Sequence, residues 1–90
     1  MPWRSEPASA IEFWCFRDEA CRLVAPVTAA LAEAHPAIRV FKVNVDEAPR
    51  LAAWFKVALT PCLMLLRNGT TIGRLYERWT VADAAGVLEG

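Results

Sequence analysis

The sequence predicts a single α/β domain whose elements follow the order β-α-β-α-β-β-α. Ninety residues are enough for one domain with one small core. Buried apolar runs alternate with helical patterns, and Asn68-Gly69 stands between two apolar runs as a hairpin turn does. A strand–helix–strand unit needs a parallel crossover, whereas a hairpin needs antiparallel strands. We therefore expect a four-stranded mixed sheet with helices on both faces.

The first third of the chain supplies a buried strand and a long helix. The aromatic, apolar run 10–16 predicts a strand buried on both faces. Asp18 is a suitable N-cap for a helix at about 19–34, because its carboxylate can accept from the first free amides. Pro26 lies inside this helix and should kink it. The residues at helical spacing that should form its buried face are Leu23, Val24, Val27, Ala30 and Leu31.

The rest of the chain alternates in the same way. The expected elements are a strand at 38–45, a short helix at 47–55, a strand at 62–66, a returning strand at 71–76 and a helix at 81–88 capped by Thr80. Residues 1–9 are expected to form an amino-terminal arm, and residues 10–90 the domain. Pro2 and Pro7 allow the arm only partial strand pairing, because proline lacks a backbone donor.

Composition removes several classes of function. Ten acidic side chains balance ten basic ones without a basic cluster, so we expect no nucleic-acid partner. No apolar run reaches the roughly 18 residues needed to span a bilayer, so we expect no membrane segment. Three cysteines do not make an even disulfide framework, which favours free thiols and a reducing cytoplasm. No group of His, Cys and Asp has the spacing of a metal site, and we expect no metal or cofactor.

The chain resembles the thioredoxin family over about residues 11–88. The matching positions are Glu12 at a buried carboxylate, Trp14 behind the redox turn, Pro26 at the helix kink, Lys42 facing the carboxylate, Thr60-Pro61 at the cis-proline loop and Asn68-Gly69 at the hairpin. The resemblance implies a minimal thioredoxin-like fold that lacks the family's first strand and helix.

Departures from the family gather at the working end. Asp18-Glu19-Ala20-Cys21 replaces Cys-x-x-Cys, and Arg17 replaces the tryptophan before it. Glu77 takes the place of a glycine in the surface that docks substrates, and Cys62 follows the proline where threonine is usual. The two-cysteine exchange of the family therefore cannot run through this turn.

Cys21 remains as a candidate thiol. The helix dipole lowers the pKa of a cysteine in the first turn, whereas Asp18 and Glu19 raise it. An unperturbed thiol is only about 3% ionised at pH 7, so a core role competes with a catalytic one. Glu12 and Lys42 are a candidate proton-transfer pair for Cys21 through a water, or an ion pair that satisfies itself.

The other two thiols are candidate partners. Cys62 stands beside the proline that rests against the redox pair in the family, so a Cys21–Cys62 bridge is of interest, provided that the Cα atoms lie within about 7 Å. Cys15 ends the buried strand, which favours a packing role. The alternatives stay open at this point.

The favoured function is a protein-binding or assembly module that keeps the scaffold and has changed the site. The candidate binding residues are Arg17, Asp18, Glu19, Thr60, Pro61 and Glu77, whose charges suit a specific partner. Without the family's first strand, strand 38–45 lies at an edge and could pair with a second copy or a partner strand. The alternative is an atypical thiol-disulfide oxidoreductase that uses Cys21 alone or paired with Cys62 or Cys15.

Overall fold

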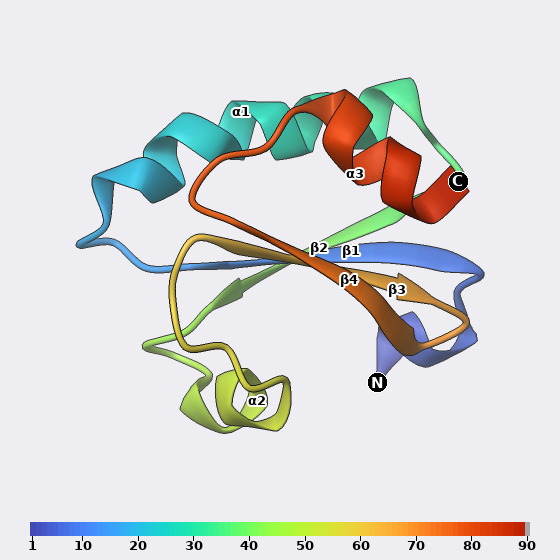
Figure 1. The fold of residues 1–90 in the computed structure, drawn as a ribbon. Helices are drawn as coiled ribbons and strands as arrows, with labels where there is room; N and C mark the ends of the chain where they lie inside the picture. The colour runs from blue at the N-terminus through green and yellow to red at the C-terminus, as the bar shows by residue number, and fades with distance from the viewer. Residues whose placement is uncertain (90) are drawn as a thin grey trace.

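A mixed sheet between two helical layers forms the protein, as Figure 1 shows for the computed structural model, which describes residues 1–89. The elements are η1 (Pro2–Ser5), β1 (Ala8–Trp14), α1 (Glu19–Ala34), β2 (Arg39–Asn44), α2 (Pro49–Trp54), β3 (Cys62–Arg67), β4 (Thr70–Tyr76) and α3 (Val81–Glu89). Helices α1 and α3 cover one face of the sheet, and α2 lies on the other. The predicted α/β fold and its element order are confirmed.

The sheet has the order β2-β1-β3-β4, with β2 and β4 at its edges. Strands β1 and β2 are parallel, whereas β1–β3 and β3–β4 are antiparallel. The hairpin between β3 and β4 turns at Asn68 and Gly69, whose φ angles of 51° and 81° both lie in the left-handed region. Gly69 also has the Arg4 backbone 3.1 Å from the place of a Cβ, so a larger residue would crowd it. The mixed sheet and the hairpin are as expected.

Helix α1 begins and ends where the sequence predicts, but its buried face is different. Leu23 is 68% exposed and Ala30 is exposed too, so the expected places of both on that face are wrong. The buried residues of α1 are Cys21, Val24, Thr28 and Leu31, which recur at intervals of three and four. Leu23 precedes Val24 by one residue, about 100° around the helix, and so points away from the sheet.

Thr28 occupies this buried face although it is polar. Its hydroxyl donates to the Val24 carbonyl (3.2 Å) and accepts from Trp79 Nε1 (3.2 Å). Both polar groups are thereby satisfied inside the core, where an unpaired one would cost about 1–3 kcal/mol. A pattern search that counts only apolar side chains misses such a position.

Two apolar clusters fill the two sides of the sheet. Helices α1 and α3 pack on residues that include Ala10, Leu63 and Leu65. On the other side, α2 and its neighbours pack on Ile11, Phe13, Cys62, Met64 and Leu66. Alternate residues of β1 and β3 thus serve opposite clusters, as the two-residue period of a strand requires. Among the described residues, no helix is long and apolar enough to cross a membrane.

The amino-terminal residues contribute to the second cluster. Trp3, in η1, is 7% exposed. Its ring meets Phe41 and Phe55 edge-on, with centroids 5.9 and 5.6 Å away. Strand β1 begins at Ala8, so the chain joins the sheet two residues before the expected start at Ala10. The segment 1–9 therefore packs on the domain.

Replacement of Trp3 by alanine should lower the free energy of unfolding by about 3–4 kcal/mol, because a buried aromatic ring and its two aromatic contacts are lost. Trp54 is 67% exposed and provides the matched control, for which we expect less than about 1 kcal/mol. Urea unfolding followed by circular dichroism measures both. Equal losses in the two variants would show that residues 1–9 add nothing to the core.

Candidate functional site

The candidate site lies where three segments meet at one end of the sheet. Cys15 follows β1, Asp18 caps α1, Cys21 lies in its first turn, and Thr60-Pro61 leads into β3. The Thr60–Pro61 peptide bond is cis. Residues distant in sequence are thus brought together by the parallel crossover and by the loop before β3.

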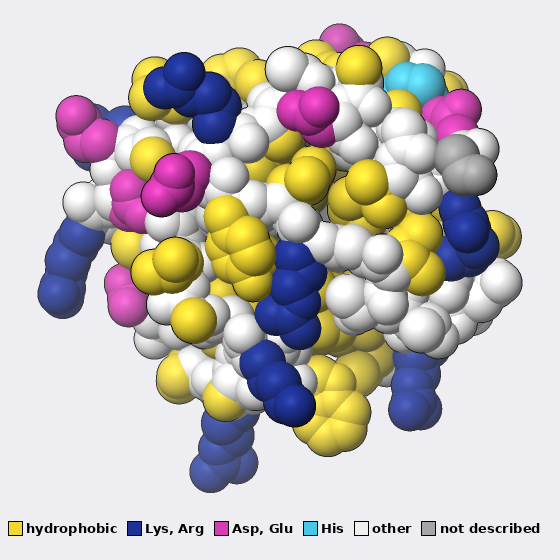
Figure 2. All heavy atoms as spheres, in the orientation of Figure 1, with side chains coloured by type: hydrophobic (Ala, Val, Ile, Leu, Met, Phe, Trp, Pro, Cys, Tyr) yellow, Lys and Arg dark blue, Asp and Glu magenta, His cyan; other side chains and the backbone are white. Residues whose placement is uncertain are grey.

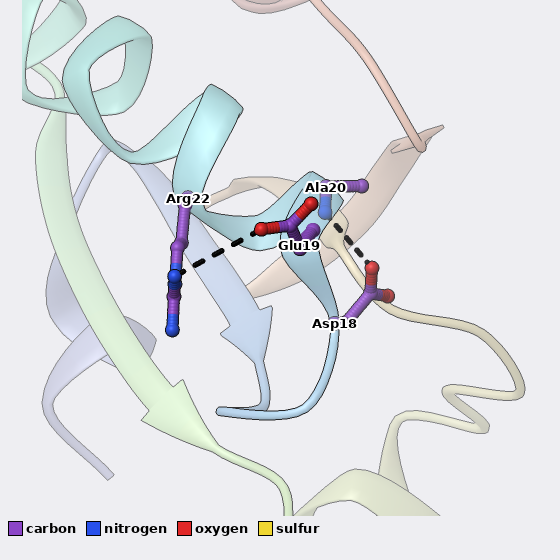
Figure 3. Close-up of polar contacts among 4 residues, drawn as sticks. All are labelled: Asp18, Glu19, Ala20 and Arg22. Atoms are coloured by element: carbon purple, nitrogen blue, oxygen red, sulfur yellow. Dashed lines mark hydrogen bonds and ion pairs between the residues drawn. The ribbon is translucent and has the colours of Figure 1, made fainter.

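Asp18 connects these segments through both oxygens of its carboxylate. Oδ1 accepts from the Ala20 amide at 3.0 Å, the capping bond in Figure 3, where Glu19 turns toward Arg22 instead. Oδ2 accepts from the Thr60 hydroxyl at 3.2 Å. Thr60 Oγ1 is also 3.4 Å from Cys15 Sγ. Because Thr60 has one proton and gives it to Asp18, the Cys15 thiol is the donor in that contact.

The two thiols nearest the turn lie beside the same carboxylate. The ligand atoms of Cys15, Asp18 and Cys21 all lie within 4.8 Å of one another. The structure therefore gives Cys21 a neighbouring thiol in Cys15. The sequence contained no sign of this proximity beyond the place of Cys15 at a strand end, because it depends on the path of the turn at 16–18.

Cys21 is a weakly acidic thiol. It is 5% exposed, and burial raises the pKa of the Cys21 thiol above its ordinary value, with the Asp18 charge acting in the same direction. A backbone hydrogen bond from Cys15 opposes them, but the net direction is upward. Little thiolate is present at neutral pH, which makes Cys21 a slow nucleophile.

Glu12 and Lys42 face the same cavity as these thiols. The two residues are register partners on β1 and β2, and they line a cavity of about 250 Å³ together with Cys15 and Cys21. Glu12 is 1% exposed, and its Oε1 has no hydrogen-bond partner among the described residues. The ion pairs formed by those residues are Arg22–Glu19 and His35–Glu89, and a Glu12–Lys42 contact is not among them. Glu12 thus presents a free acceptor next to the thiols.

Cys62 lies apart from this cavity. Its side chain belongs to the cluster on the α2 side of the sheet, with Phe13 and Met64, whereas Cys21 lies on the α1 side. Burial raises the pKa of the Cys62 thiol, although the nearby Arg74 charge opposes this. All three cysteines are free thiols, and the structure does not bring Cys62 to Cys21.

A groove of about 540 Å³ lies on the other side of Asp18. It is lined by Asp18, Ala20, Leu23, Thr60, Glu77 and Arg78. Three of the candidate binding residues, Asp18, Thr60 and Glu77, therefore lie together. Leu23 joins them because it points away from the core, which the sequence pattern did not predict.

The other three candidate binding residues differ in exposure. Arg17 and Glu19 are exposed, whereas Pro61 is fully buried and offers no side-chain surface. Figure 2 shows side chains of both charges around the end of the molecule where α1 begins. The groove thus has a mixed-charge rim and a partly apolar wall.

Glu77 has a backbone conformation that favours glycine. Its φ of 64° lies in the left-handed region, which a non-glycine residue adopts at a cost of about 1–2 kcal/mol. Its amide donates to the Pro61 carbonyl at 3.1 Å, which fixes this turn against the loop before β3. The carboxylate of Glu77 is exposed at the groove as a result.

Cys21 should react slowly with thiol reagents at neutral pH, and Asp18→Asn should accelerate the reaction about two- to fivefold. Asparagine keeps the N-cap while removing the charge that helps to raise the thiol pKa. The rate should rise with pH beyond the ordinary thiol range, because the pKa is shifted upward. Quenched labelling with mass spectrometry separates the three thiols.

The expectation that Glu19 also raises the Cys21 pKa is not supported, because Glu19 is not among the groups that shift this pKa and its side chain is 91% exposed and paired with Arg22. Glu19→Gln is therefore the matched control for Asp18→Asn. Its rate should equal that of the parent protein. A Cys21 thiol that titrates below about pH 7 would contradict the assignment of a weakly acidic group.

Comparison with known proteins identifies relatives of one kind. The family model described as Thioredoxin matches residues 4–85. A thioredoxin of Porphyra purpurea is 35% identical over 69% of this chain and 59% of its own length. One from Alicyclobacillus acidocaldarius is 36% identical over 72% of this chain and 63% of its own. The chain thus spans about 60% of the length of these relatives. Thioredoxin 1 of Synechococcus elongatus is 33% identical over 88% of this chain and 75% of its own.

Solved structures of thioredoxins have the same fold as this chain. Oxidised mitochondrial thioredoxin 3 of Saccharomyces cerevisiae superposes with a TM-score of 0.85 at 25% identity, over 97% of this chain and 82% of its own. A mutant thioredoxin of Halobacterium salinarum gives a TM-score of 0.85 at 24% identity, over 93% of this chain and 74% of its own. The second likeness concerns the fold alone. With its fold, the match over 4–85 and these relatives, the chain belongs to the thioredoxin family.

Proposed function

We propose that this protein is a protein-binding or assembly module with a redox-degenerate site. The observation that carries the proposal is the role of Asp18, which stands where the resemblance places the family's first cysteine. Its carboxylate is occupied as the cap of α1 and as the acceptor for Thr60. A carboxylate cannot attack a disulfide sulfur, so the attacking group is absent from the turn.

The remaining thiol in the turn supports the same conclusion. Cys21 is 5% exposed, and its pKa is raised by burial. Thiol exchange needs a thiolate that can reach its target. Cys21 alone supplies neither, so general disulfide reduction is not the function that this geometry favours.

The groove beside Asp18 gives the module a place to bind an extended polypeptide segment. Ala20 and Leu23 offer apolar contact, and Thr60 lies at the opposite wall. Glu77 and Arg78 place opposite charges along it. The Glu77 side chain is kept despite its unfavourable φ of 64°, which supports a role for this carboxylate in partner choice.

Strand β2 offers a second surface for assembly. It is an edge strand, so one row of its backbone groups faces no other strand of the sheet. We propose that a second copy of the chain pairs antiparallel along this edge. Arg39 and Lys42 are exposed on β2. A twofold antiparallel pairing sets residues of the same parity opposite each other, and one centred on Lys42 would place the two Lys42 side chains together. Their repulsion would keep the association weak.

A second candidate function rests on the proximity of Cys15 and Cys21, whose sulfurs lie within 4.8 Å. An atypical oxidoreductase would join them in a disulfide. Two electrons and two protons would then pass to a substrate disulfide, which becomes two thiols. Glu12, with a free acceptor in the same cavity, would take up one of these protons and pass it to the departing substrate thiolate, with Lys42 lining the cavity beside the carboxylate.

Insulin reduction with dithiothreitol distinguishes the two functions. We expect turnover below about one tenth of that of a two-cysteine thioredoxin, because the attacking thiolate is missing. Asp18→Cys should recover measurable turnover by restoring a thiol at the start of α1. Glu19→Cys is the matched control, since it adds a more exposed thiol at the adjacent position and should recover nothing. Turnover of the unmodified protein within tenfold of the two-cysteine control would reject the binding-module proposal.

Lys42→Thr should tighten self-association about two- to fivefold at low salt, because the repulsive cross-strand pair of lysines is removed. Sedimentation equilibrium at micromolar concentration measures it. Arg50→Thr removes the same charge from α2 and should leave the association as it was. A monomer in every variant, with β2 amides that exchange at a rate independent of concentration, would exclude pairing along this edge.

A further inference from the structure

Cys15, Asp18 and Cys21 bring three donor atoms together, and the proposed binding module makes no use of the two thiols. The two sulfurs and a carboxylate oxygen lie within 4.8 Å of one another. Tetrahedral zinc binds sulfur at about 2.3 Å and oxygen at about 2.1 Å, which places neighbouring ligand atoms about 3.6–3.8 Å apart. The donors therefore need to close by no more than about 1 Å, within the range of side-chain rotation.

The chemistry of the donors selects the kind of ion. Thiolates favour zinc and other soft or borderline cations over magnesium and calcium, which prefer oxygen ligands. The three residues come from the end of β1 and the start of α1, so no distant element has to move to complete the set. The spacing Cys-x-x-Asp-x-x-Cys is not a usual zinc pattern, which explains why the sequence led us to expect no metal.

Thr60 supports the arrangement from outside the donor set. Its hydroxyl donates to Asp18 Oδ2 and lies 3.4 Å from Cys15 Sγ. The Thr60 hydroxyl has one proton, which stays with Asp18 when Cys15 becomes a thiolate, so Thr60 orients the Asp18 ligand, as the outer partners of metal ligands commonly do. The cis-proline loop thereby becomes part of the same assembly of residues.

Glu12 is an independent sign that this end of the cavity accommodates positive charge. It is 1% exposed, its Oε1 has no partner among the described residues, and it lines the cavity that Cys15 and Cys21 also line. A buried carboxylate without a partner is costly. A cation held by the adjacent thiols, with a water in its open position, would lower that cost.

We propose that Cys15, Cys21 and Asp18 bind one zinc ion, with its fourth position open to the cavity beside Glu12. Each thiol loses its proton when it coordinates, so binding releases two protons to solvent and involves no oxidation or reduction. A disulfide between the same cysteines would make no use of Asp18, whose charge repels thiolates. A cation turns that repulsion into attraction among all three donors.

Cobalt(II) is the spectroscopic probe for the zinc site. In a phosphine reductant, the protein should bind one equivalent of Co²⁺ with a thiolate charge-transfer band and the intense visible bands of tetrahedral coordination. Zinc should displace the cobalt and release about two protons per ion in a weakly buffered solution. The expected Kd for zinc is about 1 μM or tighter at pH 7.5.

Matched variants assign the ligands. Cys15→Ala and Cys21→Ala should each weaken zinc binding at least about a hundredfold and diminish the charge-transfer band. Asp18→Asn, which keeps the N-cap, should weaken it at least about tenfold. Cys62→Ala removes a thiol and Glu19→Gln removes a carboxylate, both outside the donor set. Both variants should bind zinc as tightly as the parent protein does. Circular dichroism confirms the fold of each variant.

Three results would overturn the zinc site. The first is the absence of zinc binding at micromolar concentration in the reduced protein. The second is an octahedral cobalt spectrum without a thiolate band. The third is a folded Cys15→Ala variant that binds as tightly as the parent, which would place the ion elsewhere. None of these outcomes depends on insulin reduction, so the zinc site and the binding-module proposal fail separately.

Discussion

The carboxylate of Asp18 is the interaction on which the site depends. Through Oδ1 it caps α1, and through Oδ2 it accepts from Thr60, whose hydroxyl also meets Cys15. An N-cap of this kind contributes about 1 kcal/mol to stability. The second bond links the turn after β1 to the loop before β3. The Asp18 side chain thus connects two of the segments that line the groove. Burial is the main cause that raises the pKa of the Cys21 thiol, and the Asp18 charge acts in the same direction.

The sheet itself imposes the second constraint. Successive residues of a strand point to opposite faces, so the face that each residue reaches is decided by its parity. The side chains of Phe13 and its register partner Cys62 pack on the α2 side of the sheet, whereas Glu12 lines the cavity near the start of α1. Cys62 is therefore separated from Cys21 by the sheet. Cys15 lies just beyond the last strand residue, where this alternation ends, and turns toward the start of α1.

The fold was predictable because its signals are local and repeated. Apolar periodicity, the Asp18 cap and the Asn68-Gly69 turn each act over a few residues, and the structure has the elements that they indicate. Errors arose where tertiary contacts decide. Leu23 has the composition of a core position but faces the groove, while the polar Thr28 takes a core position because Trp79 and the Val24 carbonyl satisfy its hydroxyl.

The site was less predictable than the fold, since it depends on bonds between distant segments. The Asp18–Thr60 bond joins residues 42 positions apart, and nothing in either local sequence requires it. The proximity of Cys15 to Cys21 depends on the path of the turn at 16–18 between them. Glu77 likewise has a positive φ although it is not a glycine, and its backbone N–H donates a hydrogen bond to the Pro61 carbonyl. Motif matching could name these residues but not their arrangement.

Because the groove and the thiol cluster share Asp18, binding at one of them should change the affinity of the other for its ligand. The same carboxylate lines the groove and belongs to the donor set. A cation bound to it would remove negative charge from the groove. Thermodynamic linkage makes the effect reciprocal. If the cation weakens the binding of a partner that contacts the free carboxylate, the partner must weaken the binding of the cation by the same factor. A basic side chain in the groove would therefore oppose zinc, whereas an acidic one would favour it.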